Sequence, residues 1–90
     1  MSPAGEVIIE LFGVPRHKAG AAEVRVPAGT LEQVLRGVER LCPALGEVCV
    51  KGRLASHYLL ALDGQSFVAD LQRPMAPGTR LVLLSADVGG

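Results

Sequence analysis

The chain is poor in aromatic residues, with one Tyr, two Phe and no Trp among its 90 residues. Proteins that bind single-stranded nucleic acid stack the bases on aromatic side chains, and nucleic-acid-binding domains carry clustered Lys and Arg. In this chain nine Lys and Arg are balanced by nine Asp and Glu, so the formal net charge is zero. The composition therefore predicts no nucleic-acid partner and no attachment to an anionic membrane surface.

Cysteine, histidine and long apolar runs are also scarce. Cys42 and Cys49 lack the CxxC spacing of zinc and redox sites, and we interpret them as a buried apolar residue at a helix end and an ordinary strand residue. His17 and His57 have no carboxylate at ligand spacing, so we expect surface histidines and no metal. No run approaches the ~20 apolar residues that span a bilayer, and "MSPAGEVIIE" does not resemble a signal peptide. We expect a soluble, cytoplasmic, single domain.

The first third of the chain predicts a β-hairpin. "EVIIELF" (Glu6 to Phe12) is rich in the β-branched and aromatic residues that favour strands. "GVPRHKAGAA" contains two Gly and a Pro and is interpreted as a loop. "EVRV" (Glu23 to Val26) alternates polar and apolar residues, which indicates a half-buried strand.

The middle of the chain predicts one amphipathic helix. Thr30 followed three residues later by Gln33 is a capping-box pattern, and Pro43 should end the helix. Gly37, inside this segment, must either face solvent or allow another element to approach closely. The expected apolar stripe consists of Leu31, Val34, Leu35, Val38 and Leu41.

The second half predicts further strands. "EVCVKG" is either a short strand or an irregular crossing, whereas "HYLLALDGQSFVAD" indicates two strands around an Asp63-Gly64 turn. After a Pro77-Gly78 turn, "RLVLLS" should form the last strand, parallel to the first at the centre of the sheet. The fold class is therefore α+β, with a mixed sheet of four to five strands and one main helix on one face. We expect a domain over residues 1–85 and a flexible tail over 86–90.

Several stretches, in this order, resemble the MoaD/ThiS family of ubiquitin-like sulfur-carrier proteins, which have the β-grasp fold. They are "ELFGVPRHKAG", "VPAGTLEQVLRGV", "LLALDGQSF" and "PMAPGTRLVLLSADVGG". The Gly-Gly pair joined to the last of these is the most specific feature. The "LFG" opening and the long segment between helix and hairpin are closest to the MoaD-like branch, the small subunit of molybdopterin synthase. The tail "SADVGG" and Asp63 depart from that branch, which commonly has prolines near its end and an asparagine in this hairpin.

The resemblance implies a carrier protein without a catalytic constellation or bound cofactor of its own. An E1-like adenylating enzyme would use ATP to activate the carboxylate of Gly90, which would become a thiocarboxylate. Gly89 and Val88 would thread into the partner, since glycine has no Cβ and fits a narrow channel. The sulfur acceptor would be an enzyme such as the large subunit of molybdopterin synthase. Thiazole (thiamine), cysteine and tRNA thiolation pathways, a ubiquitin-like binding module and a protein modifier remain alternatives.

A carrier of this kind also needs a surface that docks on its partners. Strand alternation places Phe12 on the face marked by Glu10, and it places Val82 and Leu84 on the face marked by Arg80. The resemblance matches Phe12, Phe67 and Leu84 to an apolar docking patch, which Val82 extends. The alternative is that these side chains complete the core, an interpretation that we favour for Phe67 and leave open for Phe12 and Leu84.

Overall fold

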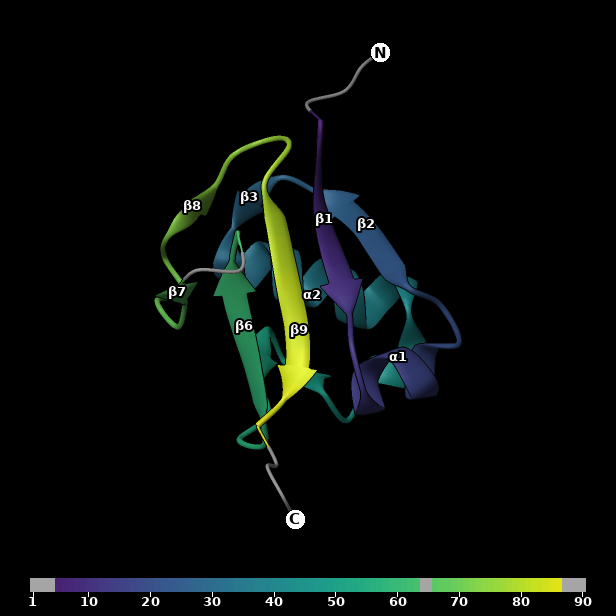
Figure 1. The fold of residues 1–90 in the computed structure, drawn as a ribbon. Helices are drawn as coiled ribbons and strands as arrows, with labels where there is room; N and C mark the ends of the chain where they lie inside the picture. The colour runs from purple at the N-terminus through teal and green to yellow at the C-terminus, as the bar shows by residue number, and fades with distance from the viewer. Residues whose placement is uncertain (1–4, 64–65, 87–90) are drawn as a thin grey trace.

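The computed structural model describes residues 5–63 and 66–86. These residues form a five-stranded sheet with the main helix, α2, behind it (Figure 1). The strand order is β2-β1-β9-β6-β7, which confirms the predicted α+β class and mixed sheet. The strands are β1 (Glu6–Leu11), β2 (Glu23–Pro27), β6 (Tyr58–Leu62), β7 (Ser66–Phe67) and β9 (Arg80–Ser85).

The first and last strands, β1 and β9, pair in parallel at the centre of the sheet, as predicted. Ile9 lies beside Leu81, and Leu11 lies beside Leu83. All four side chains are almost fully buried, and complete burial of such a side chain contributes about 1.5–3 kcal/mol. The outer neighbours β2 and β6 are both antiparallel to this central pair.

Helix α2 (Leu31–Leu41) begins with the predicted capping box. The Thr30 hydroxyl accepts a hydrogen bond from the Gln33 backbone N–H at 3.2 Å, and the Gln33 side chain accepts one from the Thr30 N–H at 2.9 Å. The predicted burial of Leu41 is wrong, because 57 % of this residue is exposed. Ten positions at 3.6 residues per turn rotate Leu41 by about 80° from Leu31, to the margin of the apolar stripe.

Gly37 lies on the side of α2 that faces β2. A Cβ atom at this position would lie only 3.2 Å from the Cβ of Val26. The glycine is itself buried, so of the two possibilities open from the sequence, the close approach is the correct one.

The core lies between α2 and the sheet. Its sixteen members are Val7, Ile9, Leu11, Val26, Leu31, Val34, Leu35, Val38, Leu45, Val48, Cys49, Leu60, Val68, Met75, Leu81 and Leu83. Among the described residues no polar or charged residue is buried. The layer is therefore apolar, and its stability comes from packing.

The segment interpreted as a loop contains a short helix, α1 (Val14–Ala19), so that prediction is wrong. Pro15 stands in its first turn, where proline loses no helical hydrogen bond. Gly20 ends it in the left-handed conformation, with φ 69°. Six residues are too few to show helical periodicity, which explains why composition alone indicated a loop.

Small elements complete the structure. A 3-10 turn (Pro43–Leu45) follows α2, and β3 (Gly29–Thr30) pairs with β8 (Pro74–Met75). The "EVCVKG" segment is a short strand, β4 (Cys49–Val50), which pairs with β5 (Arg53–Leu54). No helix within the described ranges is long and apolar enough to cross a membrane.

Candidate functional site

No helix or strand of the described residues covers the face of the sheet opposite α2 (Figure 1), and this face carries apolar side chains on four strands. Val82 lies opposite Ala61, which in turn lies opposite Phe67. A second row contains Leu84 opposite Leu59, with Phe12 at the end of β1. We call these six residues, Phe12, Leu59, Ala61, Phe67, Val82 and Leu84, the apolar face.

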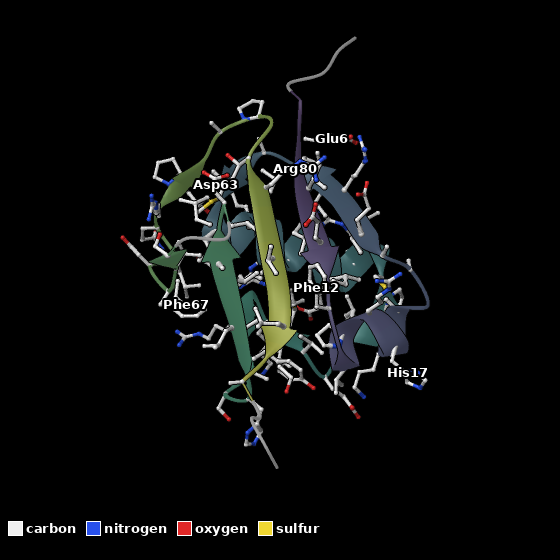
Figure 2. The ribbon with its side chains drawn as sticks, viewed as in Figure 1. Glu6, Phe12, His17, Asp63, Phe67 and Arg80 are labelled. Carbon is white, nitrogen blue, oxygen red and sulfur yellow. The ribbon has the colours of Figure 1, made fainter. Side chains whose placement is uncertain are left out.

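Phe12 is placed in this face by the pairing of β1 with β9. Its backbone N–H donates to the Leu83 carbonyl at 3.0 Å, one step beyond the last register pair, Leu11 with Leu83. Phe12 therefore lies beside Leu84. Figure 2 shows Phe12 at the lower end of β1 and Phe67 at the opposite edge of the sheet, with β9 and β6 between them.

The two phenylalanines are the most exposed members of the apolar face. Phe12 is 47 % exposed and Phe67 is 66 % exposed. The preference for Phe67 as a core residue is therefore wrong. Its strand, β7, has only two residues and both of them are exposed, so this side chain has no second layer to pack against. Val82 and Leu84 are half-buried on the same face, whereas Leu81 and Leu83 face the core, as the alternation predicted.

Sequence reasoning missed Leu59 and Ala61. The segment "YLLAL" is apolar throughout, so its pattern does not indicate which side chains face the core. The register with β9 supplies that information, because each residue of β6 shares a face with its partner. A prediction of the antiparallel pairing with "RLVLLS" would have identified both residues.

Charged pairs border the apolar face on the side of β1 and β2. The Arg80 guanidinium donates to the Glu10 carboxylate at 2.6 Å, and the Arg25 Nε donates to Glu23 at 3.0 Å. Both pairs are partly exposed, so each contributes little to stability. An apolar patch with a polar border is typical of a protein-binding surface.

The end of β9 lies beside the start of β6. Ser85 is the register partner of Tyr58, and the Ala86 backbone N–H donates to the His57 carbonyl at 2.8 Å. The described chain is therefore attached to the sheet up to Ala86. The predicted threading and reactive residues, Val88, Gly89 and Gly90, lie outside the described residues.

The cysteines and histidines form no reactive cluster. Burial, with smaller contributions from Glu39 and Cys42, raises the pKa of the Cys49 thiol to about 12, so this cysteine is a poor nucleophile. Cys49 is a buried strand residue as interpreted, whereas Cys42 is only half-buried at the end of α2. His17 and His57 are both exposed. The part of the chain that the structure describes contains no group of three or more His, Cys, Asp or Glu that could hold a metal.

Comparison with known proteins identifies the fold. No family model matches the sequence, and no curated protein matches it. The chain is similar to the crystal structure of small archaeal modifier protein 1 (SAMP1) from Haloferax volcanii, with 28 % identity and a TM-score of 0.79, over 96 % of this chain and 100 % of that chain. The fold is the ubiquitin-like β-grasp.

Two further β-grasp neighbours come from complexes. A chain of the BexX/CysO complex of Amycolatopsis orientalis is 18 % identical, with a TM-score of 0.74 over 93 % of this chain and 99 % of that chain. A chain of the complex of subunits 1 and 2 of molybdopterin-converting factor from Helicobacter pylori 26695 is 22 % identical, with a TM-score of 0.62 over 94 % and 99 %. Both likenesses show the shared β-grasp fold, and each of the two solved structures contains a protein complex.

Proposed function

We propose that this protein is a sulfur carrier, and that the carboxylate of Gly90 is converted to a thiocarboxylate. The observation that carries the proposal is the position of β9. This strand lies between β1 and β6 at the centre of the sheet, contributes Val82 and Leu84 to the apolar face, and leads directly to Ala86. From there the sequence needs only Asp87 and Val88 to reach Gly89 and Gly90.

The chemistry belongs to an E1-like adenylating partner. A carboxylate oxygen of Gly90 attacks the α-phosphorus of ATP and pyrophosphate leaves, which produces an acyl adenylate. A hydrosulfide or persulfide sulfur then attacks the acyl carbon and AMP leaves. After a persulfide attack, a thiol cleaves the new S–S bond and releases the thiocarboxylate. Glycine at positions 89 and 90 allows close approach to the nucleotide, because it has no Cβ. The carrier itself binds no cofactor in this scheme.

Docking on the partner uses the apolar face. Phe12, Phe67, Val82 and Leu84 lie on the same side of the sheet, and the last two belong to the strand that leads to the tail. A partner that covers these side chains also receives the end of β9. The neighbouring structures of the BexX/CysO complex and of molybdopterin-converting factor support a protein partner for this fold.

Molybdopterin synthesis is the destination that we propose first. The neighbour from molybdopterin-converting factor supports it through the shared fold, together with the MoaD-like opening of the sequence. The acceptor is then a partner such as a molybdopterin synthase large subunit. Thiazole, cysteine and tRNA thiolation use the same thiocarboxylate chemistry and are the alternative destinations.

Protein modification is a second candidate, favoured by the similarity to SAMP1. A modifier begins with the same adenylate, but a lysine amine attacks the acyl carbon instead of sulfur. The product is an isopeptide bond between Gly90 and the target. The two functions therefore differ in the nucleophile and not in the activation step.

Intact-mass measurement separates the candidates. The protein is incubated with ATP, an E1-like adenylating enzyme and a sulfur donor, with and without a cell extract. A mass gain equal to the replacement of one oxygen by sulfur, lost when Gly90 is deleted, supports the carrier. A conjugate to a lysine, also lost on deletion of Gly90, supports the modifier. Absence of both products with several adenylating enzymes contradicts the proposal and leaves a binding module as the alternative.

A further inference from the structure

The edge of the sheet formed by β2 offers its backbone to another strand. Ala22 accepts a hydrogen bond from Leu11 at 2.8 Å, and Ala28 donates one to Gly5 at 3.3 Å, so even-numbered residues face β1. Backbone direction alternates along an antiparallel strand. The N–H and C=O groups of Glu23 and Arg25 therefore point away from β1, and an edge of this kind is a template for strand pairing.

The side chains on this edge are complementary to a second copy of themselves. Glu23 and Arg25 lie two residues apart on the same face of β2, and their charged groups are 3.0 Å apart. A two-fold axis at Val24, with two β2 strands antiparallel, places Glu23 of each copy opposite Arg25 of the other. In this register both residues of each pair have outward-facing backbone groups, so the pair exchanges its backbone hydrogen bonds. Charges of one sign commonly protect an edge from pairing, but this arrangement brings opposite charges together.

Apolar surface lies beneath the same edge. Gly37 approaches Val26 closely, and helical spacing places Leu41, four residues later, about one turn further along the same side of α2. Leu41 is 57 % exposed, which makes it one of five large apolar residues exposed in the described chain. Val24 is half-buried and packs against the core beneath the sheet. A second copy would cover both Leu41 and Val24 near the two-fold axis.

We propose that β2 is the interface of a two-fold symmetric dimer of this chain, in which two five-stranded sheets join edge to edge. The dimer is separate from the carrier function and compatible with it, because the interface on β2 leaves the apolar face and the end of β9 accessible to other partners. One strand and one leucine from each copy form a small interface, so the dimer should be weak and dependent on concentration. The pairing of Glu23 in one copy with Arg25 in the other favours a second copy of this chain as the partner of β2.

Two charge variants test the interface. Glu23→Arg and Arg25→Glu each place like charges opposite one another in the dimer. Each should raise the dimer dissociation constant about tenfold, since two cross-strand pairs change from attraction to repulsion. An equimolar mixture of the two variants restores opposite charges in both pairs and should associate as tightly as the wild type. Sedimentation velocity over a concentration series measures all four samples, and thermal melting checks that each variant folds.

A matched control changes the same charges elsewhere. Arg53 on β5 and Asp70 after β7 are exposed and belong to neither β1 nor β2. Arg53→Glu and Asp70→Arg, alone or mixed, should leave the association unchanged. An effect as large as that of the β2 variants would overturn the proposal.

Amide hydrogen exchange provides an independent measurement. The amides of Glu23 and Arg25 should exchange more slowly as the protein concentration rises, because they gain partners only in the dimer. A wild-type protein that stays monomeric at millimolar concentration overturns the proposal. So does a dimer whose affinity is unchanged in both variants and in which these two amides are not protected.

Discussion

Phe67→Ala should separate docking from folding. Complete burial of a phenylalanine contributes about 1.5–3 kcal/mol, and Phe67 is 66 % exposed in the free protein. About 1–2 kcal/mol therefore remains to be gained when a partner covers it, which corresponds to a roughly five- to thirtyfold increase in Kd on truncation. The buried third of the side chain contributes at most about 1 kcal/mol to folding. Isothermal titration against an adenylating enzyme measures the first quantity, and urea unfolding measures the second.

The control for this prediction is Val50→Ala. Val50 is 42 % exposed, but it lies on β4, outside the five-stranded sheet. It should therefore leave the affinity unchanged. Equal losses of affinity in both variants, or no loss for Phe67→Ala in a complex that still forms, would refute the assignment of the apolar face as the docking surface.

Three further predictions concern stability and reactivity. Leu83→Ala should lower the free energy of unfolding by about 2–5 kcal/mol, since this side chain is fully buried. Leu84→Ala should lower it clearly less, because Leu84 is only half-buried. Urea unfolding compares the two variants, and equal losses of stability would contradict the assigned facing. Gly37→Val should lower the melting temperature by several degrees. A Cβ added at this position would lie only 3.2 Å from the Cβ of Val26, and the two methyl groups of valine need more room still. An unchanged melting temperature would refute the close approach. Burial raises the pKa of Cys49 to about 12 from an ordinary value of 9.0, so alkylation of Cys49 should be negligible at pH 9 until the protein unfolds. The contribution of the neutral Cys49 thiol to the free energy of unfolding should be complete below pH 9 and lost as pH rises towards 12.

Much of the fold follows from local signals in the sequence. The capping box at Thr30 marked the start of α2, and alternation in β1 and β9 assigned their inward and outward side chains correctly. These signals are local because cap geometry and strand parity depend on residues a few positions apart. The parallel pairing of the two terminal strands is not a local signal and was expected instead from the arrangement of a mixed sheet with one helix on one face, in which a strongly apolar last strand lies at the centre.

The errors occurred where tertiary context decides. Helix α1 is too short for a periodic pattern, and Leu41 lies at the margin of a stripe whose width depends on what covers it. The facing of Phe67 depends on the absence of a second layer over β7, which no local pattern encodes. Leu59 and Ala61 required the register between β6 and β9, a contact between residues more than twenty positions apart.

The parallel pairing of β1 and β9 also affects how the molecule bears force. Because β1 and β9 are parallel, the start of β1 and the end of β9 lie at opposite ends of the sheet (Figure 1). Tension between them slides β1 and β9 past one another, so the hydrogen bonds between these strands are loaded together instead of opening one after another. A pull on the end of β9 while the start of β1 is held therefore acts along the strands, and all the hydrogen bonds between them resist it together. The parallel central pair therefore helps the domain to stay folded when force is applied at the end of β9.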